Sequence, residues 1–312
     1  MNYMDCHADT LTQIPKGENL WMNTCNLDLN RIQKFTGKHT QIFAIWKDRI
    51  KMKSGCLEQE FMELYKNAVN LLESQPEHVM WCKNASDMRR AHKQKKTAAF
   101  LSVEDISIMG SLAGQIWELG IGFVQLSWNY ENEYACGAAA GQKKGISREG
   151  NKLVQNLLKH QIILDISHLS DQGVDDIFSI TEKPMIASHS NVREICNHPR
   201  NLKKEHIKEL IRRGGLIGIN FYAPFVGETA GAKMSDLIRH IDAVCELGGE
   251  DILAIGSDFD GCSLFAEGIE DVSSIPKFCR FLEKNGFEQQ FVEKLFFGNA
   301  TRFLEDQAFA AW

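Results

Sequence analysis

Three histidines and three carboxylates end short apolar segments of this sequence, and side chains of these types can bind metal ions. His7 and Asp9 lie at the end of the first segment as a His-x-Asp pair. Residues two apart on a β-strand point to the same side, so both side chains can face one centre. The other four, each at the end of a later apolar segment, are Glu104, His168, His189 and Asp258. The pattern predicts a site for divalent cations, and the mixture of imidazole and carboxylate ligands favours zinc.

The number of carboxylates in this set favours two metal ions over one. Ionised carboxylates crowded at a dry site repel one another, and burying them unpaired costs on the order of several kcal/mol. Two cations bridged by one carboxylate relieve that repulsion. Metals roughly 3.5–4 Å apart can hold a hydroxide between them and polarise a carbonyl group, which is the chemistry of hydrolysis. One such histidine alone is more often a hydrogen-bonded structural residue, so the prediction depends on the whole set.

Eight apolar or β-branched segments define the elements that must hold these side chains. They span residues 3–8, 41–46, 97–104, 122–128, 162–168, 184–189, 215–222 and 252–258. Amphipathic helical spacing separates them, for example over residues 57–71, 171–181 and 234–247. Apolar strands that alternate with helices favour a parallel sheet covered on both faces, and eight such units favour an α/β fold of the (β/α)8 TIM-barrel type. The polar residues then stand at the carboxyl ends of the strands, the active-site face of such a barrel.

No linker or low-complexity run divides the 312 residues, so we expect one barrel domain over residues 1–312. The Gly- and Ala-rich segment Asn129–Ile146 is the one long connection without a helical or strand pattern. It follows the fourth predicted strand on the active-site side, where a long loop is expected to cover the substrate. Ser147 after it is a predicted helix N-cap.

Charge and composition exclude several classes of function. The chain carries 35 Lys and Arg against 41 Asp and Glu, a formal net charge of −6. This balance gives no general attraction to nucleic acid or to anionic lipid. The first eleven residues lack the basic start and apolar core of a signal peptide, and no apolar run is long enough for a membrane helix. We therefore expect neither a nucleic-acid nor a membrane partner.

The cysteines and the other histidines are expected to take no part in the site. Nine cysteines without a CxxC pair fit free thiols in a reducing compartment, so a cytoplasmic location is expected. Cys6 is expected in the core because strand alternation turns it away from His7. The remaining histidines lie in helical or loop contexts and are expected to be solvated: His39, His78, His92, His160, His198, His206 and His240.

The sequence resembles the membrane (renal) dipeptidase family, the M19 metallopeptidases, over about residues 4–305, as a soluble member of bacterial type. The resemblance rests on the stretches MDCHADTL, SVEDI, LDISHLS, PMIASHSNVR, GINFY, AIGSDFDG and FFGNATRFL. It implies an amidohydrolase-like barrel in which His7 and Asp9 bind one zinc ion. His168 and His189 would bind the other, and Glu104 would bridge both.

The resemblance also implies residues that handle the substrate. Asp258 would hydrogen-bond the bridging water and pass its proton to the leaving amine. Arg200, eleven residues beyond His189, would bind the C-terminal carboxylate of the substrate, a role that suits a planar, permanently charged guanidinium. The chain departs from the family at two positions expected to contact substrate, because Trp128 and Phe225 stand where mammalian members have a histidine and a tyrosine.

A zinc-dependent dipeptidase is the function that this resemblance implies. A metal-bridging hydroxide would attack the peptide carbonyl of a small dipeptide, and tolerance for a D-residue at the C-terminal position is expected from the family. A binuclear metal-dependent amidohydrolase acting on another small amide or lactone stays open, because its ligand set would be much the same. The oligomeric state also stays open, with a homodimer as one alternative.

Overall fold

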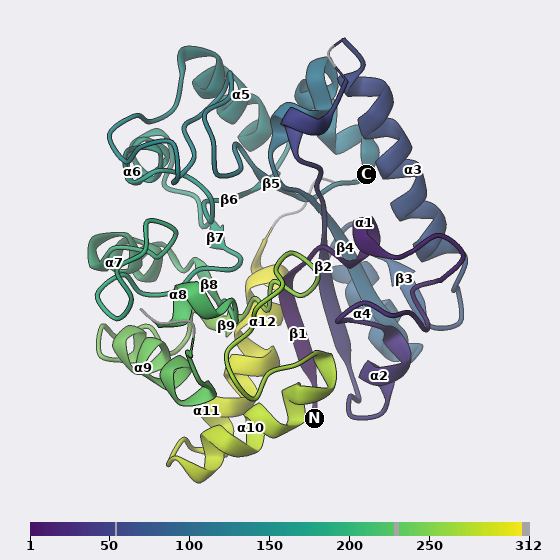
Figure 1. Cartoon of the computed structure of the whole chain (residues 1–312), viewed down its shortest axis with the longest axis vertical. Helices are drawn as coiled ribbons and strands as arrows, with labels where there is room; N and C mark the ends of the chain where they lie inside the picture. The colour runs from purple at the N-terminus through teal and green to yellow at the C-terminus, as the bar shows by residue number, and fades with distance from the viewer. Residues whose placement is uncertain (54, 228–230, 308–312) are drawn as a thin grey trace.

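A parallel β-sheet that closes into a barrel forms the centre of the fold (Figure 1). The computed structural model describes residues 1–312 except residues 54, 228–230 and 308–312. The strands of the described residues are β1 (Tyr3–Ala8), β2 (His39–Ile45), β3 (Val79–Trp81), β4 (Thr97–Val103), β5 (Phe123–Gln125), β6 (Ile163–Asp165), β7 (Ile186–Ala187), β8 (Leu216–Ile219) and β9 (Leu253–Ile255). Their order is β2-β1-β9-β8-β7-β6-β5-β4, and the pairing of β4 with β2 closes the ring.

The eight predicted strands form this barrel, which confirms the (β/α)8 fold. The short strand β3 was not predicted. It pairs with residues 97–99 at the start of β4, on the edge that β5 takes over at residues 102–103. Three residues are too few to show a hydrophobic period, so the sequence gives no signal for such a strand.

Helices follow the strands and cover the outside of the barrel. The α-helices of the described residues are α1 (Thr10–Gln13), α2 (Leu29–Gln33), α3 (Leu57–Glu73), α4 (Ala85–Lys93), α5 (Arg148–Lys159), α6 (Asp171–Ile180), α7 (Lys204–Arg213), α8 (Ala223–Val226), α9 (Met234–Cys245), α10 (Ile275–Lys284), α11 (Gln289–Glu293) and α12 (Asn299–Asp306). The 3₁₀ helices η1 (Arg49–Lys51), η2 (Ile106–Leu119, with a kink at Gly110) and η3 (Val272–Ser274), and the π-helical turn η4 (Lys294–Gly298), complete the list. The predicted cap of α5 is present, since the Ser147 side chain accepts a hydrogen bond from the Gly150 N–H at 3.0 Å.

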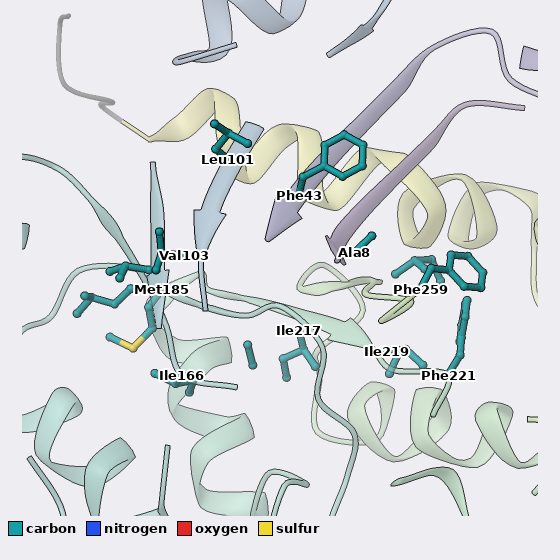
Figure 2. Close-up of a cluster of buried hydrophobic side chains, with 14 of the residues drawn as sticks. Ala8, Phe43, Leu101, Val103, Ile166, Met185, Ile217, Ile219, Phe221 and Phe259 are labelled. Atoms are coloured by element: carbon teal, nitrogen blue, oxygen red, sulfur yellow. The ribbon is translucent and has the colours of Figure 1, made fainter. Parts of the chain in front are cut away.

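Two apolar clusters stabilise the barrel, one in its interior and one between the strands and the surrounding helices. The smaller cluster takes at least one side chain from each of the eight barrel strands, among them Cys6, Phe100 and Phe123, and therefore fills the interior. Residues of α4 and α12 also belong to it. Figure 2 shows part of the larger cluster, which includes Phe43 of β2 and Leu101 of β4 and packs against the surrounding helices. Cys6 is fully buried, as expected.

The expectation that the other histidines are solvated is wrong for His39, His206 and His240, which are buried. His240 on α9 shows the reason. Its Nδ1 accepts a hydrogen bond from the Val192 N–H at 3.1 Å, and its Nε2–H donates to the Val226 carbonyl at 2.9 Å. A neutral histidine with both ring nitrogens paired can lie on the buried face of an amphipathic helix.

The segment Asn129–Ile146 contains no named helix or strand, as expected, but it is not the one long connection of this kind. Residues 14–28, 188–203 and 256–271 are similar in this respect. These connections are held by scattered hydrogen bonds, such as that from the Asn26 N–H to Asp260 at 2.5 Å, rather than by a regular ladder. Sequence periodicity therefore says little about them.

Candidate metal centre

The predicted ligands lie at the ends of the barrel strands, although several strands end earlier than predicted. His7 is on β1, and Glu104 directly follows β4. His168 comes three residues after β6 ends, and His189 two residues after β7 ends. Beyond the ends of β6 and β7, the buried Asp165 carboxylate replaces the backbone hydrogen bonds between the strands. It accepts hydrogen bonds from the N–H groups of Ser167 at 3.0 Å and Ser188 at 3.1 Å. The chain is thus held in register while it leaves the strand.

The Glu104 carboxylate lies between two groups of donors. Its Oε2 is 3.4 Å from His7 Nε2, and that nitrogen is 3.3 Å from Asp9 Oδ2. Its Oε1 is 2.7 Å from His168 Nε2 and 3.9 Å from His189 Nε2. All five side chains are at least nine-tenths buried. The structure therefore brings together every metal ligand predicted from the sequence, with Glu104 in the middle.

The hydrogen bonds on the far sides of two imidazoles show that this cluster fits cations. His168 Nδ1 is 3.0 Å from Asn129 Oδ1, and His189 Nδ1 is 2.7 Å from Ser188 Oγ. If each Nδ1 carries the proton, both Nε2 lone pairs point into the cluster, where these two atoms are 2.9 Å apart. Lone pairs so close to each other and to a carboxylate repel one another unless a cation lies among them.

Unpartnered atoms and spacing support the same conclusion. Within the described residues, His7 Nε2 and Asp9 Oδ1 are buried without a hydrogen-bond partner. Ligand atoms of His7, Glu104 and His189 lie within 4.8 Å of one another, and so do those of His7, Asp9 and Asp258. Buried polar atoms are normally paired, so orphaned atoms that converge in this way fit metal ions.

Burial and mutual charge perturb the titration of these groups in the absence of a bound cation. Burial raises the pKa of the Glu104 carboxyl, and the nearby Asp9 charge raises it further. Burial lowers the pKa of His168 and His189 well below the usual range for histidine. Burial also acts to lower the pKa of His7, but the Glu104 and Asp9 carboxylates outweigh it and raise this pKa well above its usual range. Such opposed shifts are typical of functional sites.

The chain after β9 brings Asp258 to the same cluster through an unusual turn. Asp258 and Asp260 both have positive φ values, 62° and 67°, which non-glycine residues adopt at a cost of about 1–3 kcal/mol each. Gly261 follows, and a Cβ atom at this position would be less than 3.0 Å from Asp9 Oδ2 and from Asp258 Oδ1. The space between these two carboxylates therefore depends on a glycine.

Asn220 holds the Asp258 carboxylate in place. Its Nδ2 donates to Asp258 Oδ2 at 3.0 Å and to the His189 carbonyl at 3.3 Å. Burial raises the pKa of the Asp258 carboxyl to about 6. The sequence analysis missed Asn220, although it directly follows β8 and so has the same position relative to its strand as Glu104 has to β4.

Arg200 lies beside this cluster as a buried cation. Its Nη2 donates to the His189 carbonyl at 3.4 Å, whereas its Nε and Nη1 are buried without a hydrogen-bond partner among the described residues. The guanidinium carbon is 5.4 Å from the centre of the Phe225 ring. Burial lowers the pKa of this guanidinium to about 10. A buried cation with free N–H groups is suited to binding an anion.

A cavity of about 470 Å³ opens onto these groups. Asp9, Glu104, His168 and Asp258 line it together with Gln13, Trp46, Trp128, Asn129, Tyr222, Phe225, Asp260, Gly261, Cys262 and Ser263. The rings of Trp46 and Trp128 pack with their centres 5.0 Å apart on its wall. The structure thus places Trp128 and Phe225 at the cavity, whereas Arg200 is not among the residues that line it. The sequence analysis missed Trp46, which stands in no recognisable motif. It also missed Tyr222, although this residue ends the GINFY stretch.

The fold and this set of donors define a metal-dependent hydrolase built on a (β/α)8 barrel. Residues 1–311 match the model of the membrane dipeptidase family, peptidase family M19, and the chain belongs to that family. It is a metallo-dipeptidase, a hydrolase that depends on divalent metal. No helix in the described part of the chain is both long and apolar enough to span a bilayer.

Comparison with known proteins gives relatives over most of the chain. An uncharacterized protein in the pqqA 5′ region of Klebsiella pneumoniae is 30% identical over 244 residues, which are 72% of this chain and 88% of the relative. The crystal structure of dipeptidase AC, a metallopeptidase of family M19, has a TM-score of 0.88 at 22% identity and covers 100% of this chain and 99% of its own. A metallopeptidase from Rhodobacter sphaeroides, bound to a phosphinate mimic of L-Ala-D-Ala, has a TM-score of 0.87 at 22% identity and the same coverage.

Proposed function

We propose that this chain is a zinc-dependent dipeptidase with two metal ions at the site described above. One ion would be held by His7 and Asp9 and the other by His168 and His189, with Glu104 shared between them. The observation that carries the proposal is the convergence of buried, mutually repelling Nε2 and carboxylate atoms on both sides of Glu104. When bound there, the two cations would activate water and polarise the peptide carbonyl group.

Asp258 is the residue that we propose to move a proton during the reaction. Asn220 fixes its Oδ2 through a hydrogen bond of 3.0 Å, and Asp258 lines the cavity beside Gly261. A carboxylate fixed at the cavity wall can take the proton of the attacking water and deliver it to the leaving nitrogen. Proton transfer of this kind typically contributes about 10²–10⁴-fold to the rate.

Arg200, Trp128 and Phe225 would contact the substrate. The unpartnered Nε and Nη1 of Arg200 can pair with the C-terminal carboxylate of a dipeptide, which would give the buried guanidinium its missing anion. Phe225 has no hydrogen-bonding group, and Trp128 offers one indole N–H, so we propose that these two residues shape the pocket by size. The segment Asn129–Ile146 would cover a bound substrate.

Several finer features of the function are proposals of the same kind. The Rhodobacter sphaeroides relative binds a mimic of L-Ala-D-Ala, which supports a D-residue at the C-terminal position of the substrate here as well. A cytoplasmic location is supported by the abundance of cysteine without a disulfide in the described residues. We expect a dipeptide as the partner molecule and no nucleic acid.

The test is a metal count and a substrate screen on one purified sample. The parent enzyme should hold about two divalent metals per chain and should hydrolyse some members of a panel of L,L and L,D dipeptides. Glu104→Gln should disturb both metal sites because one carboxylate serves both. A stoichiometry of one metal that zinc saturation does not change would refute the two-metal proposal, and inactivity toward every dipeptide would refute the substrate class.

A further inference from the structure

A chain of hydrogen bonds beneath the metal centre has no role in the function proposed so far. Asp165 ends β6, and its Oδ2 accepts a hydrogen bond from Ser188 Oγ at 2.5 Å. The same Ser188 Oγ is 2.7 Å from His189 Nδ1. Each of these three side chains is at least 95% buried. The chain thus leads from a buried carboxylate, through one hydroxyl, to the back of a proposed zinc ligand.

The chemistry of the three groups decides which atom donates each hydrogen bond. An ionised carboxylate can only accept, so the single Ser188 hydroxyl proton points to Asp165. The Ser188 oxygen must then accept from His189, and the proton of this imidazole lies on Nδ1. Nε2 is left as the lone pair that faces Glu104 and His168. Asp165 therefore selects the metal-binding tautomer of His189 through the serine.

The same hydroxyl oxygen reaches a second imidazole. His7 Nδ1 is 3.5 Å from Ser188 Oγ, at the outer limit of a hydrogen bond, and the His7 and His189 rings pack with their centres 3.8 Å apart. A hydroxyl oxygen has two lone pairs, so it can accept from both Nδ1–H groups at once. These two histidines belong to different proposed metal ions. One serine thus contacts one ligand of each ion.

The backbone around Ser188 is built to hold it in this place. Its N–H donates to Asp165 Oδ1 at 3.1 Å, and Gln125 Nε2 donates to Asp165 Oδ2 at 3.0 Å. A Cβ atom on either Gly218 or Gly256 would collide with the Ser188 carbonyl oxygen. Gly218 on β8 and Gly256, which directly follows β9, therefore leave room for the Ser188 carbonyl group. The serine cannot shift without disturbing three strands.

We propose that Ser188, oriented by Asp165, is a positioning residue that fixes the tautomers of His189 and His7 and thereby supports both metal ions. Groups that hydrogen-bond the far nitrogen of a metal-binding histidine typically change metal affinity by about 10–100-fold when they are removed. Because one hydroxyl serves ligands of both ions, its loss should weaken both binding steps. Loss of a ligand belonging to one ion would act mainly on one step.

The experiment measures zinc affinity directly, by competition of the metal-free enzyme with a chromophoric chelator. Ser188→Ala should bind zinc about 10–100-fold more weakly than the parent in both steps. Ser190→Ala is the matched control, since it removes a hydroxyl of equal size on the other side of His189 that has no hydrogen-bond partner among the described residues. It should leave both affinities within a factor of about three of the parent. Thermal unfolding of the metal-free proteins shows whether each variant is folded.

A second variant keeps the proposal testable if Ser188→Ala does not fold. Asp165→Asn retains the shape of the side chain, but its amide can donate to Ser188 and so reverse the direction of the hydroxyl proton. It should weaken zinc binding to a similar extent, and combining it with Ser188→Ala should add little, because both changes remove one connected chain.

The outcomes separate this inference from the function on which it rests. If the parent binds no second zinc ion, the proposed two-metal function fails. If the parent binds two zinc ions and Ser188→Ala binds both as tightly as Ser190→Ala does, the positioning role is wrong while the function stands. A loss confined to one binding step would overturn the shared role of the serine.

Discussion

Gly261→Ala is the substitution for which the structure gives the sharpest prediction. A Cβ atom at this position would approach Asp9 Oδ2 and Asp258 Oδ1 to less than 3.0 Å, closer than real Cβ atoms come to their neighbours. Both oxygens belong to buried carboxylates that other contacts hold, since Asn220 binds Asp258 and His7 lies 3.3 Å from Asp9. Ordinary contact begins near 3.4 Å, so each oxygen would have to retreat by about 1 Å.

A displacement of that size should lower the catalytic rate. A misplacement of about 1 Å in a reacting group can lower the rate about 10²-fold, and here the two displaced carboxylates are a proposed metal ligand and the proposed proton carrier. We therefore expect kcat/KM for a good dipeptide substrate to fall by about 10²-fold or more. The melting temperature should change much less, because the added methyl group faces the cavity rather than the apolar core.

The assay compares Gly261→Ala with a glycine that has room for a methyl group. At Gly114 on η2 the nearest atom to an added Cβ is 3.9 Å away, so Gly114→Ala should keep parental activity. Steady-state kinetics, zinc content and thermal unfolding are measured on the parent and both variants. Parental kcat/KM in Gly261→Ala would show that the space between Asp9 and Asp258 is not needed and would refute the reasoning.

Four further predictions concern the substrate site and stability. Asp258→Asn should keep near-parental zinc content and lose about 10²-fold or more in kcat, because proton transfer typically supplies that much; an unimpaired variant would remove Asp258 from the mechanism. Dipeptides with an amidated C-terminus should be poor substrates for the parent, and Arg200→Ala should reduce the difference in hydrolysis rate between amidated and free dipeptides. Equal rates for both forms with the parent would show that Arg200 does not bind the C-terminal carboxylate. Trp128→Phe should keep most of kcat and shift mainly KM, whereas a hundredfold loss of kcat with metals bound would show that the indole N–H is catalytic. Burial lowers the pKa of His240 to about 4, below the ordinary value of 6.5, so the folded state favours the neutral ring. The free energy of unfolding therefore keeps its full value above pH 6.5 and decreases as the pH falls towards 4. Urea unfolding of His240→Gln should depend less steeply on pH in that range than unfolding of the parent.

The sequence alone determined the fold class and the proposed metal ligands, for a local reason. Apolar segments of strand length that alternate with amphipathic helices leave few topologies other than a parallel barrel. In that fold every strand ends on the same face, so a polar residue such as Glu104 or His189 at the end of an apolar run is placed by its own neighbours in sequence. The short strand β3 was not predicted because three residues are too few to show a hydrophobic period. The burial of His240 was not predicted because the sequence does not distinguish a buried histidine with hydrogen-bond partners from an exposed one.

Only the tertiary structure decided how the centre is supported. Asn220, Ser188 and Gly261 act through atoms of residues far away in sequence, and nothing in their own segments marks those contacts. Asp165 meets Ser188 because β6 and β7 are neighbours in the barrel, and the hydroxyl can orient an imidazole only when all three groups are buried together. The direction of a hydrogen bond and the room for one methyl group depend on distances of a few tenths of an ångström. Packing sets such distances, whereas the pattern of residue types along the chain does not.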